Sequence, residues 1–588
     1  MKARGPRRPA ANLRSVNYAT SPLLAARTPP GRSRFVVALV ALAFLGLAAR
    51  AVWVQVVNAD FYRAEGAKRF LLSEDLPAVR GRIVDRQGQL LAASVPAPSI
   101  AVNPRAFEAD AAQRKALARL LDMPVKELEQ RVAGRSQFAY LRRFSDEATW
   151  DQVRTLGIKG LMQRPETRRS YPEGEASAHI VGFTNLEEQG LEGIERQFDA
   201  TLRGHDGQRA VVRDRLGRIV EDIGDAVDPV PGQDLQLSID AKIQSFAYQR
   251  LRDAVRAHDA RGGSAVVLDT VTGEVLALAN YPSYDPERRR NLGGGQMRNR
   301  ALTDLFEPGS TMKPFTIALA LERGLVTPST RIDTGPGYIT VTGSTIRDTK
   351  PHGVLTVEQV LQKSSNVGTV KLAMQMKPRE MWELFSQVGM GHKPAIEFPG
   401  AATGRLRAAK TWRPVEQATM SYGYGLSTSL LQLARAYTVF ANDGTLLPLT
   451  LLKRDAPAIG EPVLKPETAR AMRAMLAMAT TSAGTAPLAQ TVGYSVAGKT
   501  GTVRKQEGKG YSMERYRSWF VGFAPAGQPR IVVAVMVDEP RKGGNYGGVI
   551  AAPVFSQVAQ QTLRVLGVAP DIEVKPLIVN GTGEEESV

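Results

Sequence analysis

The chain has 588 residues, of which 43% are hydrophobic and 23% are charged. This composition is that of a large globular protein with several folded units, and it excludes a disordered chain. The absence of cysteine excludes disulfides, zinc–thiolate sites, iron–sulfur clusters and cysteine nucleophiles. Because only five histidines are present, we expect no metal site and no cofactor.

The formal net charge is +18, and residues 1–34 contain eight Lys or Arg residues with no Asp or Glu. Nearly half of the net positive charge therefore lies in an N-terminal basic tail. This distribution fits a membrane surface or an acidic polymer as the partner, and we expect no nucleic acid.

An apolar segment follows directly, over residues 35–57. Its first 15 residues carry no charge, Arg50 interrupts it, and apolar character resumes through Val57. At 1.5 Å per residue, 23 residues reach about 34 Å, enough to cross a membrane. Since Lys and Arg stay on the cytoplasmic side, we expect a single-pass inner-membrane anchor with residues 58–588 in the periplasm. A cleaved signal peptide is the alternative, but the basic tail is too long for one.

Residues 58–232 mix short strand patterns with helical ones, and we expect a β-rich domain there. Residues 82–91 predict a strand, a turn and a second strand, whereas residues 111–133 predict one helix. A Pro- and Gly-rich stretch then marks a boundary, after which we expect the next domain at residues 233–566. Residues 567–588 end in acidic residues and are expected to form a loose tail.

The domain at residues 233–566 begins with a predicted β-hairpin over residues 264–280. Largely helical material follows to about residue 440, including a helix opened by a capping box of Thr356 and Gln359. Later segments predict three strands and a final helix, at residues 495–503, 518–524, 530–537 and 552–566. Because successive strands lie close in sequence, they pair antiparallel. We predict an α+β fold with an antiparallel sheet of about five strands flanked by helices.

Two motif interpretations compete for the region around Lys499. The run from Gly493 to Thr500 fits the P-loop pattern, and the apolar run ending at Asp538 and Glu539 fits the carboxylates that accompany it. A P-loop works only where its glycine loop opens a helix, and the glycines and β-branched residues after Thr500 do not favour one. A periplasmic site also has no ATP, so the ATPase interpretation is disfavoured.

The other interpretation joins residues 499–501 to two upstream motifs. Residues 310–313 supply Ser-x-x-Lys at an apparent helix start, and residues 364–366 supply Ser-x-Asn. Each motif alone is weak evidence. Together, in this order, they match the three motifs of penicillin-binding proteins and serine β-lactamases.

A serine hydroxyl becomes a nucleophile only when a base accepts its proton, and no histidine lies near Ser310 in the sequence. Lys313, one helical turn away, is the expected base because its amine can reach Ser310. Burial and the cation of Lys499 favour a neutral amine there. We expect the Ser364 hydroxyl to bond Lys313 or Lys499 and to relay a proton to the leaving amine. Asn366 is expected to hold a substrate amide or Lys313.

The predicted strand that contains Lys499 is the expected binding edge for a substrate. Gly501 has no side chain, so a peptide can lie close and add as an extra strand. The Lys499 charge and the hydroxyls of Thr500 and Thr502 suit a terminal carboxylate. The backbone N–H groups of Ser310 and Thr502 are the expected oxyanion donors.

Longer runs around these motifs resemble the division-specific class B penicillin-binding proteins, the FtsI family. The resemblance covers about residues 35–566, and the two tails show none. The similar runs are residues 80–86, 178–185, 296–314, 363–368, 421–426, 546–548 and 552–555.

This resemblance implies a D,D-transpeptidase that crosslinks septal peptidoglycan. Ser310 is then expected to attack the D-Ala-D-Ala carbonyl of one stem peptide, and an amine of a second stem to take up the acyl group. β-Lactams are expected to leave a slowly cleared acyl-Ser310. The resemblance also implies a non-catalytic pedestal domain of the dimerisation type at residues 58–232. An FtsW-type glycan polymerase and other divisome membrane proteins are the expected partners.

Two other functions stay open, a hydrolase of the same fold and a β-lactam sensor or inactive division protein. No glutamate-bearing deacylation motif is identifiable, and the complete set of motifs argues against an inactive protein. Two basic stretches, residues 288–290 and 503–517, are expected either to steer an anionic glycan or to be solvated loop charge.

Overall fold

The structure is a computed structural model, and it describes residues 29–62, 65, 71–134, 136, 138–213, 219–222, 226–289, 292–508 and 510–573. Most of the predicted basic tail (residues 1–34) and of the predicted C-terminal tail (residues 567–588) lies outside these residues. The chain divides into two compact units. One comprises Met1–Asp75 with Gln208–Val227, and the other comprises Leu76–Gly207 with Asp228–Val588.

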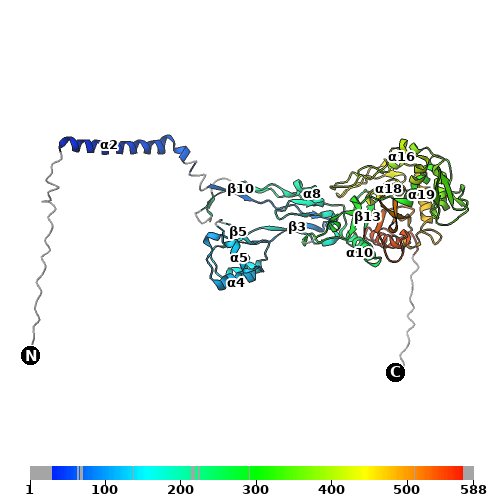
Figure 1. Cartoon of the computed structure of the whole chain (residues 1–588), viewed down its shortest axis with the longest axis horizontal. Coiled ribbons are helices and arrows are strands. Elements are labelled where there is room, and N and C mark those ends of the chain that lie inside the picture. Colours follow the sequence, from blue (N-terminus) through cyan, green and yellow to red (C-terminus); the bar gives the residue numbers. More distant parts are fainter. Residues whose placement is uncertain are drawn as a thin grey trace, which may run out of the picture. The chain divides into compact units, whose positions relative to one another are not determined.

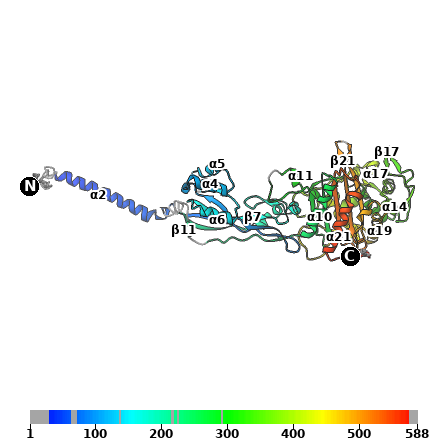
Figure 2. The same ribbon diagram turned by 90° about the horizontal axis from the view of Figure 1, so that it is seen from below.

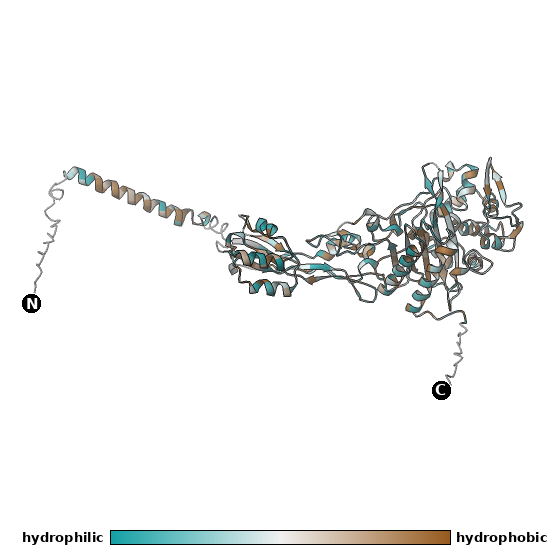
Figure 3. Ribbon diagram, turned by 60° about the horizontal axis from the view of Figure 1, so that its bottom comes forward, coloured by the Kyte–Doolittle hydropathy of each residue, from teal (hydrophilic) through white to brown (hydrophobic). Residues whose placement is uncertain are grey.

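The first unit contains a helix that is long and apolar enough to cross a membrane, the one such helix among the described residues. This helix, α2 (Pro30–Val52), continues as a π-helical turn over Trp53–Val57. None of the α2 side chains is buried, and hydrophobic residues run along most of its length (Figure 3). The rest of the unit holds a three-stranded sheet of order β1-β10-β11, with β1 at Leu71–Leu76, β10 at Gly207–Arg213 and β11 at Ile219–Asp222.

Two small sheets form the N-terminal part of the second unit. The predicted strand–turn–strand is confirmed as β2 (Ile83–Val84) and β3 (Leu90–Pro96), which pair antiparallel. They belong to a sheet of order β12-β2-β3-β7, completed by β12 (Leu235–Gln236) and β7 (Thr167–Ser170). The second sheet has order β5-β4-β6, with strands Ala139–Arg142, Ser99–Val102 and Leu161–Arg164.

The single helix predicted over residues 111–133 is wrong. The structure has two helices, α4 (Ala111–Leu120) and α5 (Val125–Val132). Asp122 between them adopts φ +49°, a left-handed conformation that ends a helix. Pro124 follows and cannot donate a helical hydrogen bond, so the periodic apolar pattern continues across a real break. These helices and α6 (Glu147–Thr155) pack on the apolar face of the β5-β4-β6 sheet.

A buried ion network holds this N-terminal part together. The Glu195 carboxylate accepts hydrogen bonds from Arg80 Nε (2.8 Å) and from Arg169 Nε (2.7 Å), and all three side chains are almost fully buried. Arg80 also pairs with Asp199 at 2.8 Å, and Arg169 donates to the Gly81 carbonyl. The network joins the start of β2 and strand β7 to the short helices α8 (Gly193–Gln197) and α9 (Asp199–Arg203). Another short helix, α7 (Ala178–Val181), contacts α8. A two-stranded sheet, β8 (Phe183–Thr184) with β9 (Gly190–Glu192), adjoins them.

The C-terminal part of the second unit is built on a five-stranded sheet of order β14-β13-β23-β22-β21, in which every pair of neighbours is antiparallel. The predicted α+β fold is therefore confirmed. The predicted hairpin is β13–β14. Of the three later strands, the first two are longer than predicted, and the third lies within one residue of its predicted bounds. The strands are β13 (Gly262–Asp269), β14 (Val275–Tyr281), β21 (Ala497–Glu507), β22 (Gly510–Ala524) and β23 (Ile531–Asp538).

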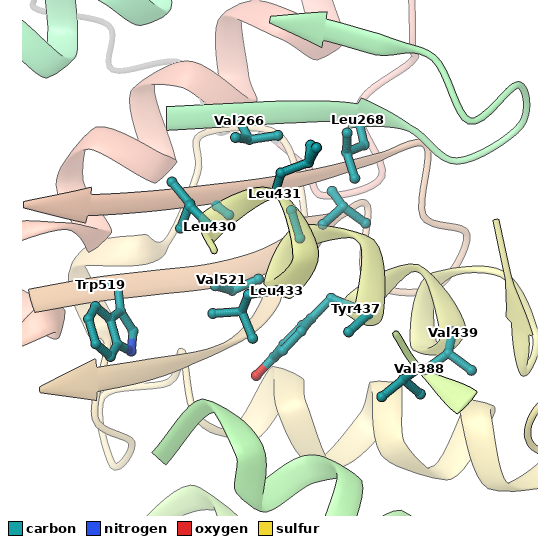
Figure 4. Packing of buried hydrophobic residues seen from close by; sticks show 14 of the residues in the cluster. Val266, Leu268, Val388, Leu430, Leu431, Leu433, Tyr437, Val439, Trp519 and Val521 are labelled. Carbon is teal, nitrogen blue, oxygen red and sulfur yellow. The ribbon is translucent and has the colours of Figure 1, made fainter. Parts of the chain in front are cut away.

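Helices cover both faces of this sheet, which explains why β13 and β23 are buried at every residue. Helices α10 (Ala241–Ala257) and α21 (Ala552–Val565) lie side by side on one face, where they pack on Ala265 and Val267 (Figures 1 and 2). The alternate residues Val266 and Leu268 point to the other face and meet α18 (Leu430–Ala441) (Figure 4).

The region predicted to be largely helical also contains short strands. Two small antiparallel sheets, β15–β18 and β16–β17, interrupt it between α13 and α14. The predicted capping box of Thr356 and Gln359 is present and opens α14. The remaining α-helices of this part of the chain, including two that follow this region, are α11 (Gly294–Met297), α12 (Arg300–Thr303), α13 (Lys313–Glu322), α14 (Val357–Gln362), α15 (Asn366–Ala373), α16 (Pro378–Gln387), α17 (Pro414–Met420), α19 (Pro466–Met478) and α20 (Gly547–Ile550). The strands are β15 (Arg331–Asp333), β16 (Tyr338–Val341), β17 (Ser344–Arg347), β18 (Val354–Thr356), β19 (Thr445–Leu446) and β20 (Glu461–Pro462).

The buried network predicts a strong effect of Glu195→Ala on stability. This substitution leaves two buried guanidinium groups without their shared carboxylate, which costs about 3–5 kcal/mol. As the control, Glu127→Ala breaks an exposed pair with Arg131 and costs at most ~0.5 kcal/mol. Calorimetric melting of the full chain measures both variants, and equal melting temperatures for the two contradict the account.

Candidate active site

Ser310 lies in a 3₁₀ turn, Gly309–Met312, that leads directly into helix α13. Gly309 adopts φ +56°, and a Cβ added there would lie 2.3 Å from Cγ2 of Val503 on β21. Glycine is therefore required on both conformational and steric grounds. The Gly309 N–H donates to the Gly423 carbonyl (3.0 Å), which fastens the turn to the loop before α18.

Lys313, the first residue of α13, has a fully buried side chain. Its Nζ donates to the backbone carbonyl of Ser364 and to Ser364 Oγ, the latter at 3.1 Å. Of the two partners expected for the Ser364 hydroxyl, the structure shows Lys313. Within the described residues, the Lys313 amine thus donates its hydrogen bonds to Ser364. The sequence analysis predicted that this amine contacts Ser310 directly.

Ser364 lies in a strained turn between α14 and α15. It adopts φ +59°, which is uncommon for a residue with a side chain. The next residue, Ser365, caps α15 by accepting the Gly368 N–H, and its hydroxyl donates to Asp348. Asp348 also accepts the backbone N–H of Val367 (3.0 Å), so one carboxylate holds the whole turn.

Of the two alternatives expected for Asn366, the described residues do not show a hydrogen bond from its side chain to Lys313. Its Nδ2 donates instead to the Arg347 carbonyl at the end of β17 (2.8 Å). Asn366 is the first residue of α15, and its side chain is half-buried. The alternative expectation, a contact with a substrate amide, stays a prediction.

Lys499, Thr500, Gly501 and Thr502 lie on β21, the edge strand of the sheet. The P-loop interpretation is wrong because the pattern runs into this strand and no helix follows it. The fully buried Lys499 amine donates to the carbonyl and hydroxyl oxygens of Thr500, both at 3.2 Å. Since β21 has one free edge, a further extended chain can pair with it.

The other side chains of this segment have defined partners. The Thr500 hydroxyl donates to the hydroxyl of Thr485 (3.0 Å), and the Thr502 hydroxyl accepts the Gly547 N–H (3.0 Å). A Cβ on Gly501 would lie 1.5 Å from Nε1 of Trp519 on the neighbouring strand. Gly501 is therefore also required by the packing beneath the strand.

Burial dominates the electrostatics of the two lysines. It lowers the pKa of Lys313 well below its usual value, the Lys499 charge lowers it further, and the Asp348 carboxylate acts in the opposite direction. Burial also lowers the pKa of Lys499 to about 7. A neutral Lys313 amine, as the sequence predicted, can accept a proton near neutral pH.

Asp348 and Thr485 are contacts of the predicted motifs that sequence reasoning missed. Asp348 holds the Ser364 turn, and Thr485 bonds Thr500 from the loop after α19. Each lies in an unpatterned loop, and no residue spacing connects it to the motif it contacts. Their roles follow only from the fold.

The two basic stretches are largely engaged in local contacts. Arg289 lies over the Phe183 ring at 4.2 Å and donates to the Thr184 carbonyl. In the segment of residues 503–517, Lys505 and Arg517 both pair with Asp538. These contacts favour a structural role for much of this charge over steering of a glycan.

The lowered pKa of Lys499 makes stability depend on pH. Between about pH 7 and pH 10.5 the unfolded chain holds this proton and the folded chain does not. The unfolding free energy of the wild type therefore rises relative to Lys499→Met by up to ~1.4 kcal/mol per pH unit. Denaturant unfolding of both proteins across this range measures the difference, and a difference independent of pH contradicts the assignment.

Comparisons with known proteins agree with this arrangement. Residues 263–560 match the family model of the penicillin binding protein transpeptidase domain, and residues 75–237 match that of the penicillin-binding protein dimerisation domain. A probable peptidoglycan D,D-transpeptidase PenA of Neisseria meningitidis is 41% identical over 94% of this chain and 95% of the relative. The peptidoglycan D,D-transpeptidase FtsI of Escherichia coli K12 is 39% identical over 91% of both chains.

Solved structures give the same result. The transpeptidase domain of Burkholderia pseudomallei penicillin-binding protein 3 is 52% identical, with a TM-score of 0.54, over 57% of this chain and 98% of that one. A peptidoglycan synthetase from Bifidobacterium adolescentis shares the fold over 86% of this chain and 98% of that one, with a TM-score of 0.68 at 24% identity. The chain therefore belongs to the class B penicillin-binding proteins of the FtsI type.

Proposed function

We propose that this protein is a peptidoglycan D,D-transpeptidase that crosslinks stem peptides of the septal cell wall and is acylated by β-lactams. The observation that carries the proposal is the buried, low-pKa Lys313 amine on Ser364, at the start of the helix that follows Ser310. The relatives in Neisseria meningitidis and Escherichia coli, which are named as peptidoglycan D,D-transpeptidases, support the same reaction.

The first half-reaction forms an ester on Ser310. Lys313 Nζ accepts the hydroxyl proton while Ser310 Oγ attacks the carbonyl carbon between the two D-Ala residues of a donor stem. The backbone N–H groups of Ser310 and Thr502 stabilise the oxyanion. The C–N bond then breaks, the proton passes from Lys313 through the Ser364 hydroxyl to the leaving nitrogen, and D-Ala departs.

The second half-reaction returns the enzyme to its starting state. An amine of a second stem peptide attacks the ester carbon and loses a proton to the same relay. The ester C–O bond breaks, Ser310 Oγ takes the proton, and an amide crosslink between two stems is released. Water in place of the amine would give hydrolysis, so the reaction requires that the acyl-enzyme meets an amine first.

The binding edge for the donor is β21. The stem peptide pairs with the free edge of this strand, and its terminal carboxylate meets Lys499 and the hydroxyls of Thr500 and Thr502. The Asn366 amide contacts a peptide group of the substrate. No cofactor or metal takes part in this scheme.

We further propose the domain division expected from the sequence. It has a cytoplasmic tail (1–34), a membrane helix (35–57), a pedestal (58–232), a periplasmic transpeptidase domain (233–566) and a C-terminal tail (567–588). The α2 helix is a single-pass anchor in the inner membrane, with its N-terminus in the cytoplasm. An FtsW-type glycan polymerase and other divisome membrane proteins are the partners that this orientation suits.

Intact-mass measurement after incubation with penicillin tests the nucleophile. We expect a penicilloyl adduct on the full chain that persists for hours, because transpeptidases clear this ester slowly. Ser310→Ala should abolish the adduct, whereas Ser482→Ala, at an exposed serine after α19, should retain it. An adduct that survives in Ser310→Ala would falsify the assignment, and rapid loss of the adduct would indicate a hydrolase.

The pH dependence of penicillin acylation tests the base. Acylation slows as pH falls through the pKa of Lys313, because the protonated amine cannot accept the Ser310 proton. Lys499→Met removes the cation that lowers the pKa of Lys313. The acid limb of the pH profile of the acylation rate therefore moves to higher pH. Lys371→Met, at a half-buried lysine that bonds the Asp333 carbonyl, is the control and leaves the limb in place. A limb that does not move in Lys499→Met excludes the proposed coupling.

A further inference from the structure

Trp519 on β22 is the largest fully buried side chain beneath the active-site strand. It pairs with Gly501 across the β21–β22 ladder, and its ring fills the space that a side chain at Gly501 would occupy. The ring packs on Phe306, with ring centroids 4.6 Å apart. Figure 4 shows Trp519 among the buried residues of the cluster that also contains Val521 and Leu433.

Among the residues that the structure describes, the indole nitrogen has one hydrogen bond, and it is to the turn that carries Ser310. Nε1 donates to the Pro308 carbonyl at 3.0 Å. The same carbonyl also accepts the Thr311 hydroxyl at 2.7 Å. A buried indole N–H needs an acceptor, and here the acceptor lies two residues before Ser310.

The Pro308–Gly309 peptide group is thereby fixed at both ends. Its carbonyl is bound by Trp519, and its N–H donates to the Gly423 carbonyl at 3.0 Å. Gly309 adopts φ +56°. The orientation of the Pro308–Gly309 peptide plane therefore sets the orientation of the Ser310 backbone. A rotation of the plane moves both the Ser310 hydroxyl and its backbone N–H.

We infer that Trp519 is a positioning residue that orients Ser310 for acylation through the Pro308–Gly309 peptide. This inference rests on the proposed function, in which Ser310 is the nucleophile. Trp519 is fully buried beneath Gly501, and its indole N–H contacts the Pro308 carbonyl. It links the substrate-binding strand to the nucleophile turn, since the side chain that excludes a Cβ at Gly501 also holds Pro308.

Packing alone does not explain why a tryptophan occupies position 519. An apolar ring of similar size would fill the space beneath Gly501 equally well. Only a donor on that ring can add a second hydrogen bond to the Pro308 carbonyl beside the one from the Thr311 hydroxyl, so the N–H is the part of Trp519 that bears on the reaction. Removing the N–H and keeping the ring therefore separates the two roles.

The test is the kinetics of penicillin acylation of the full chain carrying Trp519→Phe. We expect the acylation rate constant to fall by about tenfold, the effect of one misplaced hydrogen bond, while the dissociation constant of the preceding complex is unchanged. A second variant carries β-(3-benzothienyl)alanine at residue 519, which keeps the bicyclic ring and lacks only the donor. It should slow acylation to the same extent.

Trp412→Phe is the matched control. Its indole N–H donates to the Arg407 carbonyl at 2.9 Å, outside the nucleophile turn. Both Phe variants should melt at lower temperature, but only Trp519→Phe should acylate slowly. Wild-type acylation by both residue-519 variants, or equal slowing in Trp412→Phe, overturns the inference. Loss of the adduct in Ser310→Ala alongside such a result would leave the proposed function intact.

Discussion

The buried amine of Lys313 constrains the architecture around it. A charged ammonium group is strongly disfavoured away from water, so full burial of this side chain holds only if its pKa falls and its nitrogen finds acceptors. Ser364 supplies both acceptors from a turn in which its φ is +59°. The Asp348 carboxylate supports that turn by accepting hydrogen bonds from Ser365 and Val367. The amine, the strained turn and the supporting carboxylate thus form one unit.

The surrounding fold supplies the dry environment that this unit requires. Helices on both faces of the five-stranded sheet bury two of its strands completely. The edge strand β21 brings Lys499 into the same buried region while it leaves one edge free for a peptide. Two glycines allow neighbouring segments to pack closely, because a Cβ on Gly309 would clash with Val503 and a Cβ on Gly501 would clash with Trp519.

Much of the fold follows from local patterns. The β13–β14 hairpin, the capping box of α14 and the antiparallel order of the late strands depend on turn residues and on sequence distance, which are visible in the chain. The break between α4 and α5 and the strands inserted before α14 were missed. The apolar period of α4 continues across the break into α5, so the pattern alone does not reveal the break. The inserted strands are too short to show a period of their own.

The site divides in the same way. Ser310, Lys313, Ser364 and Lys499 could be proposed as site residues from the sequence because three motifs occur in a fixed order. The geometry of these residues could not be predicted from the sequence. The hydrogen-bond partner of Lys313 depends on the backbone conformation of Ser364, and the hydrogen-bond partner of Asn366 depends on where β17 ends. Asp348, Thr485 and Trp519 come from segments far apart in the chain, and only the folded sheet and loops bring them to the motifs.

The ionisation state of Lys313 tests the central claim most directly. Lysine ε-carbons labelled with ¹³C report protonation by their chemical shift, and Lys313→Arg assigns the resonance in the full chain. The account predicts a neutral Lys313 amine at pH 7 that becomes protonated only at lower pH. A Lys313 amine that is fully protonated at pH 7 would contradict the assignment of this residue as the base.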